Sequence, residues 1–130
     1  MEQAEKQIGA IEWRDLTVQD AESLKGFYES VVGWKSGAVS MGDYQDYTMD
    51  LPETGETVAG VCHARGCNLG LPPQWLMYVR VRNVHDSIAA SEKLGGKLLY
   101  GPKGMGDDEF CVVQDPAGAV IGLISEVNKA

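Results

Sequence analysis

The sequence has no apolar run that approaches the ~18 to 20 residues of a membrane-spanning helix. It also has little positive charge, with 11 Lys and Arg against 19 Asp and Glu, for a formal net charge of -8. Such a surface repels phosphate backbones and anionic lipid, so we expect neither nucleic acid nor a membrane as a partner. The chain starts with polar and acidic residues, where a signal peptide would be basic and then apolar. These absences predict a soluble, cytoplasmic protein.

Cysteine and histidine are also scarce, with three Cys and two His. An odd number of Cys in a chain large enough to bury its own core does not indicate a disulfide framework, so we expect reduced thiols. The glycines around Lys103 (Gly101, Gly104 and Gly106), which we expect in a loop, match no phosphate-binding motif. No G-x-S-x-G motif is present either, so the sequence supports neither nucleotide binding nor a serine hydrolase.

The composition is that of one globular domain: 130 residues, 44% hydrophobic and 23% charged. Apolar residues at helical spacing predict a helix over residues 20–32, with Asp20 as its N-cap and Gly33 after its end. A second helix is predicted to begin after Asn83 and to stop at Gly95. Residues 1–8 show no periodicity and read as a flexible N-terminus. Strands are expected at residues 11–18, 38–41, 45–51, 57–63, 75–82, 97–100, 109–114 and 119–126.

The chain also repeats itself. Adding 63 to the residue numbers carries Val18-x-Asp20 onto Val81-x-Asn83 and Gly33 onto Gly96. Adding 62 carries the segment 58–61, Val-Ala-Gly-Val, onto the segment 120–123, Val-Ile-Gly-Leu. Two copies are too few for a repeat array, so the pattern indicates a duplicated module of one strand, one helix and three strands.

Several further segments occur in a fixed order: Glu12-Trp13, Val18-x-Asp20, Phe27-Tyr28, Gly33-Trp34, Trp75-x-x-Tyr78, Gly95-Gly96 and Asp115-Pro116-x-Gly118-Ala119. Together with the internal repeat, they resemble the vicinal oxygen chelate superfamily, which includes glyoxalase I, the bleomycin-resistance proteins and the extradiol dioxygenases. The resemblance covers residues 9–126 and implies an α+β fold of two tandem βαβββ modules. Their curved mixed sheets would surround a cup-shaped cavity, with the helices outside. We expect module one at about residues 9–63, a linker at 64–74 and module two at about 75–126.

Members of this superfamily with metal chemistry hold the ion with side chains on the first and last strand of each module. In this chain those positions align with Trp13, Gly60, Leu76 and Gly122, none of which can ligate a metal. Glu12 lies one residue from the first position, but a one-residue slip turns a strand side chain to the opposite face. We therefore expect no metal and no other cofactor, and a cavity that the two glycines widen.

Strand alternation then predicts which residues line the cup. Asp15, Cys62, Tyr78 and Arg80 share the parity of the four vacant positions. The paired strands add further side chains in a less defined register. The predicted ligand-binding residues are Trp13, Asp15, Tyr47, Met49, Gly60, Cys62, Leu76, Tyr78, Arg80, Phe110, Val112 and Gly122. The same side chains could instead fill the cup as a second core.

The candidate catalytic residues are Asp15, Tyr78, Arg80 and Cys62. Asp15 and Arg80 could form an ion pair, or act separately as a base and as an anchor for a substrate carboxylate. Tyr78 could donate a hydrogen bond to a bound carbonyl or serve only as a wall. Cys62 could be a reactive thiol beside a cationic neighbour or a small buried hydrophobe.

Other polar residues offer weaker patterns. Cys62, His63 and Cys67 form one short cluster with ligand-type side chains but without a fourth ligand for zinc. Cys111 has the opposite parity from its neighbours and is expected beneath a helix. His85 is expected to be a solvated first-turn residue beside Asp86.

Two functions follow as hypotheses. The first is a binding protein that holds a small, largely apolar or aromatic molecule in the cup without a metal. The second is a lyase or isomerase of the glyoxalase type that works without the usual metal. The resemblance also implies a homodimer.

Overall fold

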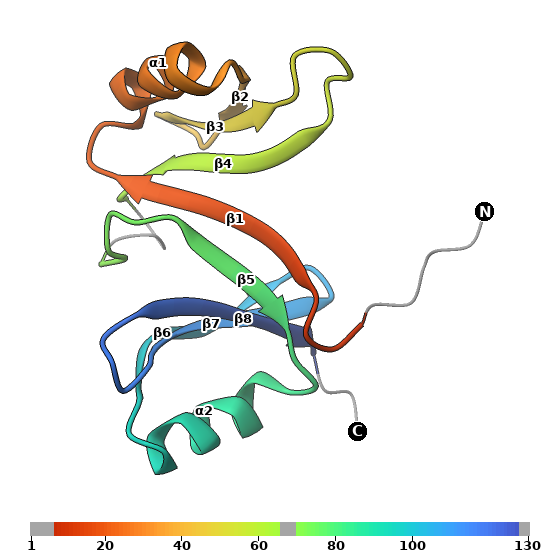
Figure 1. Cartoon of the computed structure of the whole chain (residues 1–130), viewed down its shortest axis with the longest axis vertical. Coiled ribbons are helices and arrows are strands. Elements are labelled where there is room, and N and C mark those ends of the chain that lie inside the picture. The colour runs from red at the N-terminus through yellow and green to blue at the C-terminus, as the bar shows by residue number, and fades with distance from the viewer. Residues whose placement is uncertain (1–6, 66–69, 128–130) are drawn as a thin grey trace, which may run out of the picture. The chain divides into compact units, whose positions relative to one another are not determined.

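The computed structural model describes residues 7–65 and 70–127. The described residues divide into two compact units, one of residues 13–65 and 70–75 and the other of residues 7–12 and 76–127. In chain order the elements are β1 (Ile11–Val18), α1 (Ala21–Val32), β2 (Lys35–Ser40), β3 (Gln45–Asp50), β4 (Thr57–His63), β5 (Leu76–Arg80), α2 (Val84–Lys93), β6 (Lys97–Met105), β7 (Asp108–Gln114) and β8 (Val120–Glu126). Module one runs from β1 to β4 and module two from β5 to β8 (Figure 1).

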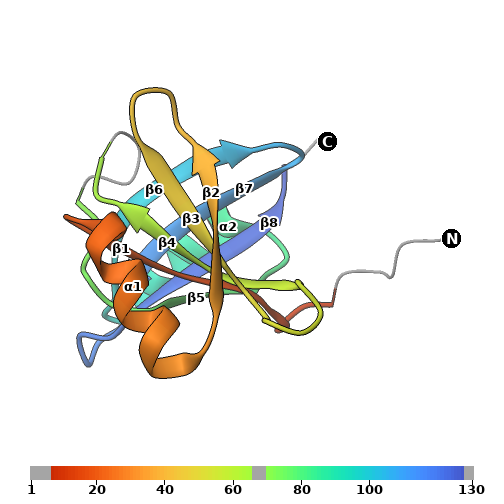
Figure 2. The same cartoon turned by 90° about the horizontal axis from the view of Figure 1, so that it is seen from above.

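Each module has one mixed sheet with one helix against it. In module one the strand order is β2-β3-β4-β1, where β1 and β4 are parallel and the other pairs are antiparallel. Module two has the matching order β6-β7-β8-β5, with β5 and β8 parallel. Figure 2 shows α1 lying along the sheet of module one. The predicted α+β fold of two βαβββ modules with mixed sheets is confirmed.

Local signals place the helix ends as predicted. The Asp20 carboxylate accepts hydrogen bonds from the backbone N–H and the hydroxyl of Ser23, and Gly33 ends α1 with a left-handed backbone at φ 93°. Asn83 Oδ1 accepts from the backbone N–H groups of His85 and Asp86 at the start of α2. Side-chain oxygens thus satisfy amide groups that a helix leaves without an intrahelical partner.

The core of module one lies between α1 and its sheet. The register pairs Tyr47 with Val61 and Met49 with Ala59, and these four side chains pack with Ala21 of α1. Tyr47 and Met49 therefore lie on the helix side of the sheet, whereas Gly60 has the opposite parity. Their predicted place in the ligand cup is wrong, because Thr48 is the β3 residue that faces the same way as Gly60.

The core of module two has the same construction. Cys111 and Val113 of β7 pack with Val84 of α2, so the predicted position of Cys111 beneath a helix is confirmed. The hydroxyl of Ser125 accepts a hydrogen bond from the Val84 backbone N–H at 3.0 Å, which joins β8 to the first turn of α2. Burial raises the pKa of the Cys111 thiol to about 11, so it is a neutral core side chain.

Three sequence expectations differ from the structure. β6 continues through Gly101, Lys103 and Gly104, which were expected in a loop, because irregular pairing with β7 lets the strand extend past Tyr100. β2 begins at Lys35 rather than at residue 38. The predicted apolar face of α1 is also only partly buried, since Phe27 is 54% exposed and Val31 is 63% exposed.

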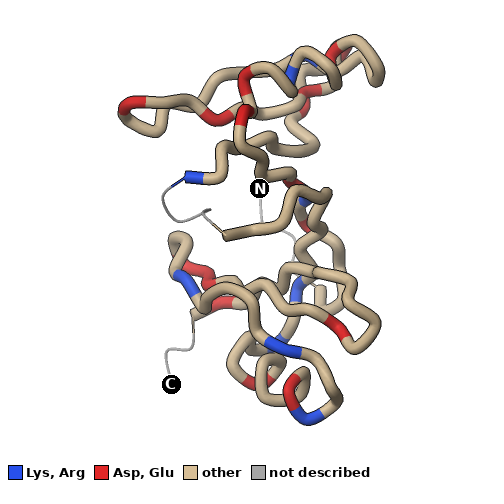
Figure 3. Tube along the Cα trace, turned by 90° about the vertical axis from the view of Figure 1, so that its left-hand side faces the viewer, with Lys and Arg blue, Asp and Glu red and all other residues tan. Residues whose placement is uncertain are grey.

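Charged residues of both signs occur in each module. Acidic residues occur along both modules, with Lys and Arg between them (Figure 3). In the part of the chain that the structure describes, no helix is long and apolar enough to cross a membrane.

Candidate functional site

The superfamily's metal positions on the last strand of each module are occupied here by glycines. Strand pairing places each glycine beside a residue that was predicted to line the site. Gly60 of β4 pairs with Asp15 of β1, and Gly122 of β8 pairs with Tyr78 of β5. These residues lie on the sheet face opposite the helix of their own module, which we call the helix-free face. In module two that face also holds Phe110 and Val112, as predicted, since they pair with Ile124 and Gly122.

The two glycines do not widen the site as expected. A Cβ atom on Gly122 would lie 2.3 Å from Cδ2 of Tyr78, so the tyrosine ring occupies the space that a ligand side chain would need. A Cβ atom on Gly60 would lie 3.3 Å from the Trp13 ring and 3.4 Å from the Asp15 Cβ. The glycines therefore accommodate neighbouring side chains, which is a packing role.

The residues present do not fit a metal ion. Neither glycine has a side chain, Leu76 is buried and apolar, and the Trp13 indole can only donate a hydrogen bond. Within residues 7–65 and 70–127, no group of three or more His, Cys, Asp or Glu side chains could hold an ion. Cys67 of the short Cys and His cluster lies outside the described residues.

Asp15 is the polar group of the module one site. The Trp13 indole N–H donates to its Oδ2 atom at 3.2 Å. Its Oδ1 atom is buried and has no hydrogen-bond partner among the residues that the structure describes. Burial, with a smaller contribution from the Asp46 carboxylate, raises the pKa of Asp15 from 3.8 to about 6, although the Trp13 hydrogen bond opposes this change. The carboxyl group can therefore exchange a proton close to neutral pH.

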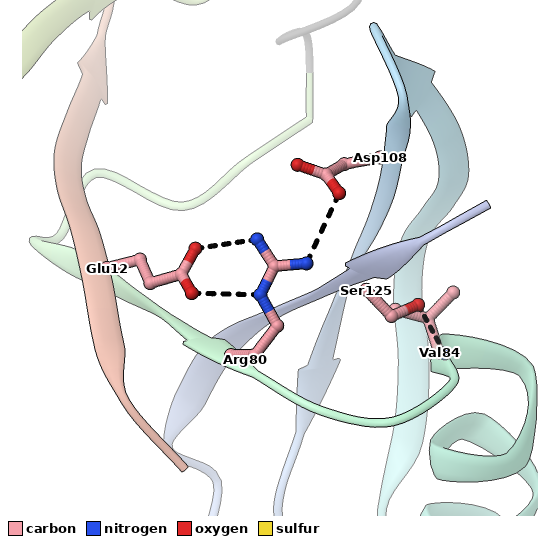
Figure 4. Close-up of polar contacts among 5 residues, drawn as sticks. All are labelled: Glu12, Arg80, Val84, Asp108 and Ser125. Carbon is pink, nitrogen blue, oxygen red and sulfur yellow. Dashed lines mark hydrogen bonds and ion pairs between the residues drawn. The ribbon is translucent and has the colours of Figure 1, made fainter. Parts of the chain in front are cut away.

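Arg80 lies in a different set of contacts from the one expected. Its guanidinium donates two hydrogen bonds to the Glu12 carboxylate, at 2.7 and 2.8 Å, and one to Asp108 at 3.2 Å (Figure 4). Glu12 and Asp108, rather than Asp15, are its ion-pair partners. Arg80 is only 3% exposed, and these hydrogen bonds raise its pKa further above the ordinary value. Because two carboxylates bind this cation, it is a structural centre and not an anchor for a substrate carboxylate.

An aromatic group extends across module two beside Tyr78. The Tyr78 and Phe110 rings meet edge to face with centroids 5.9 Å apart, and Tyr100 lies 5.9 Å from Phe110 on its other side. Tyr78 is 7% exposed, so its ring is buried against these neighbours. We call Tyr78, Phe110 and Tyr100 the aromatic wall.

The remaining polar candidates have local partners. His63 Nδ1 lies 2.9 Å from the Gln45 carbonyl, and the His63 backbone N–H donates to Asp46 Oδ1 at 2.8 Å. Cys62 is half-buried and, by the alternation of β4, faces away from His63. His85 is paired with Glu109 at 3.2 Å, whereas Asp86 was the expected neighbour. The side chains of Cys62 and His63 therefore point to opposite faces of β4.

Sequence reasoning missed three residues of these clusters. Glu12 was considered only as a metal ligand, and its ion pair depends on Arg80, a residue 68 positions away. Asp108 has the parity of Phe110, so extending the alternation by two residues could have found it. Tyr100 carried no comparable signal, because the register of β6 shifts on both sides of it.

Comparison with known proteins identifies curated relatives and structural neighbours. No protein-family model matches the chain. A protein provisionally named glyoxylase CFP32, from Mycobacterium bovis and Mycobacterium tuberculosis, is 29% identical over 126 residues, which covers 92% of this chain and 47% of the relative. The chain thus spans about half the length of the curated relatives it matches.

Two solved structures have the same architecture. A glyoxalase/bleomycin resistance protein/dioxygenase superfamily member from Vibrio splendidus has a TM-score of 0.58 and 13% identity, over 90% of this chain and all of the other. Methylmalonyl-CoA epimerase from Mycobacterium tuberculosis has a TM-score of 0.55 and 13% identity, over 98% of this chain and 95% of that one. At these identities the likeness establishes the fold. The predicted resemblance is confirmed at that level.

Proposed function

We propose that this chain, which has the fold of the glyoxalase/bleomycin resistance protein/dioxygenase superfamily, binds a small, largely apolar or aromatic molecule without a metal. The candidate binding surfaces in this proposal are the helix-free faces of the two modules, each considered by itself. Fold alone does not decide between binding and catalysis, so the proposal depends on the side chains of this chain.

One observation carries the proposal: aromatic side chains cover the glycines at the last-strand metal positions. Trp13 lies against Gly60, and the Tyr78 ring fills the space over Gly122. The rings of Phe110 and Tyr100 continue the aromatic group beside Tyr78. Small-molecule sites are typically lined by aromatic and apolar groups with a few placed polar groups, which is the composition here.

The first test combines metal analysis with ligand screening on untagged protein purified without chelators. We expect metal far below one equivalent, and thermal stabilisation by aromatic small molecules. One equivalent of zinc, nickel or iron would contradict the metal-free proposal. Failure of every aromatic compound to bind would contradict the binding function.

A control for the metal analysis must respect the packing of Tyr78. Gly60→Glu with Gly122→Glu restores ligand-type side chains, but the Gly122 change collides with the Tyr78 ring unless Tyr78→Ala is added. The triple variant should take up more metal than Tyr78→Ala alone, because only the former has the two carboxylates.

Asp15 favours a second candidate, a metal-independent lyase or isomerase. Its buried carboxyl has a pKa near 6, which suits a group that takes a proton from carbon beside a carbonyl. Named relatives and neighbours include a glyoxylase and an epimerase. The test is solvent deuterium exchange into carbonyl compounds, methylmalonyl-CoA among them. Catalysed exchange that Asp15→Asn abolishes would favour this candidate, and its absence from every compound would reject it.

A further inference from the structure

The internal repeat supplies a comparison that singles out Asp15. Adding 63 carries Asp15 onto Tyr78, and adding 62 carries Gly60 onto Gly122. In both modules the first residue lies opposite the glycine across a pair of parallel strands. In module two the Tyr78 ring fills the space over Gly122. Module one has the same backbone arrangement, but a short carboxyl group stands where the ring would be.

Only one of the two oxygens of the Asp15 carboxyl group has a hydrogen-bond partner among the described residues. Trp13 donates to Oδ2, while the buried Oδ1 has no partner among the described residues. Buried polar atoms nearly always have a hydrogen-bond partner, and an exception calls for a cause such as a functional role or a bound water or ion. The duplicated module shows that this backbone arrangement also accepts an aromatic side chain, so the backbone does not require a carboxyl group at this position.

The charges around Asp15 indicate which kind of ligand group could hydrogen-bond to its Oδ1 atom. Asp46 of β3 lies on the same sheet face as Asp15 and is buried. Its Oδ1 atom already accepts a hydrogen bond from the His63 backbone N–H. Its carboxylate acts electrostatically on Asp15. An anionic group would be repelled by both carboxylates, whereas a neutral or cationic donor would be attracted. The adjoining Trp13 ring supplies apolar surface for the rest of such a molecule.

We propose that Asp15 is the polar anchor of the ligand, and that the ligand is a neutral or cationic molecule whose N–H or O–H group donates a hydrogen bond to Asp15 Oδ1. This inference rests on the proposed binding function and narrows its ligand class. Donor-free aromatic molecules and carboxylic acids are excluded as preferred ligands.

The test uses matched pairs of aromatic fragments that differ by one donor, such as indole and benzofuran. Binding to the full chain is followed by ligand-observed NMR and titration. In the wild type we expect the donor member to bind roughly tenfold more tightly or better, as for a hydrogen bond to a charged group. Asp15→Leu should remove this preference while keeping benzofuran binding, and Asp15→Asn should reduce it.

Asp43→Asn is the matched control, because Asp43 is an exposed carboxylate that pairs with Arg65 in the loop between β2 and β3, away from the proposed binding surface. This variant should keep the donor preference. Should Asp15→Leu not fold, Asp15→Asn, which preserves the shape of the side chain, decides the question. Equal affinity for both members of each pair, unchanged by either Asp15 variant, would overturn the inference and leave the proposed function standing. Binding of neither member of any pair would overturn both.

Discussion

At the scale of single residues, the site contains pairs in which a large side chain occupies the space beside a glycine of the neighbouring strand. Tyr78 and Gly122 form the tightest of these pairs, since a Cβ atom on the glycine would lie 2.3 Å from the ring. A glycine here is required by close approach and not by a special backbone angle. Residue 122 is therefore a glycine because the ring of Tyr78 leaves no room for a side chain there.

Gly122→Ala is expected to lower the free energy of unfolding by about 1–3 kcal/mol, the usual cost of overpacking a core. In a Tyr78→Ala background the same change should cost much less, because the colliding ring is gone. Urea denaturation of the four proteins in this double-mutant cycle measures the coupling. Equal costs in the two backgrounds would contradict the proposed contact.

Asp15 predicts a pH dependence of stability. Its pKa is raised from 3.8 to about 6 in the folded state, so its contribution is most favourable below pH 3.8 and is lost as the pH rises through about 6. The difference corresponds to at most about 3 kcal/mol at neutral pH. Asp15→Asn should thus be more stable than wild type at pH 7, by a margin that shrinks as the pH falls towards 4.

Thermal melts of both proteins across this pH range check the expectation. Asp46→Asn is a useful comparison, because it removes a carboxylate that already has its hydrogen-bond partner. That variant should be destabilised at pH 7. Loss of stability in Asp15→Asn at pH 7 would instead indicate a structural role for Asp15.

At the scale of elements, Arg80 joins three segments of module two's compact unit. Its side chain binds Glu12 at the start of β1 and Asp108 at the start of β7, while its backbone N–H donates to Ala10 and its carbonyl accepts from Gly9. Bidentate pairing fixes orientation as well as charge, which Lys cannot reproduce. The network thus holds the segment before β1 against β5.

Arg80→Met should lower the free energy of unfolding by about 3–5 kcal/mol, because it leaves two partly buried carboxylates without their cation. Arg65→Met is the matched control, since Arg65 pairs with Asp43 at an exposed site and should contribute no more than about 1 kcal/mol. Denaturant titration at neutral pH measures both. Similar losses for the two variants would contradict the distinction between buried and exposed pairs.

At the scale of the whole molecule, the surface combines net negative charge with exposed apolar side chains. The formal net charge is -8. Large apolar residues such as Phe27 and Val31 of α1 nevertheless face water in the single chain. Association between copies would remove apolar surface from water, which favours the homodimer that the family resemblance implies.

Light scattering after size-exclusion chromatography should therefore give a mass about twice the 14.1 kDa of one chain. Added salt should leave this mass unchanged or favour the dimer, because it screens repulsion between acidic copies. A mass of one chain at every protein concentration would reject the homodimer.

Signals that act over a few residues were enough to predict most elements. The bounds of β1 and β4 match the strands expected at residues 11–18 and 57–63. The caps of both helices are formed by the predicted Asp20 and Asn83. These features depend on alternation and capping, which are local interactions. The internal repeat then placed Asp15 and Tyr78 at equivalent positions of two modules.

Strand register decided what alternation could not. Alternation correctly grouped Tyr47 with Met49, but only the pairing of β3 with β4 showed that both lie under α1. In module two the same reasoning placed Phe110 and Val112 on the correct face. Parity states which residues share a face, and the neighbouring strand determines which face it is.

The sequence by itself therefore determined most of the elements, both helix caps and the duplication, because alternation, capping and repeated motifs are visible in neighbouring residues. Only the tertiary structure decided the partners: Glu12 for Arg80, Tyr78 for the space over Gly122, and none among the described residues for Asp15 Oδ1. These depend on distances between atoms far apart in the chain. Hydrogen bonds and close packing change over fractions of an ångström, which residue types and spacing do not encode.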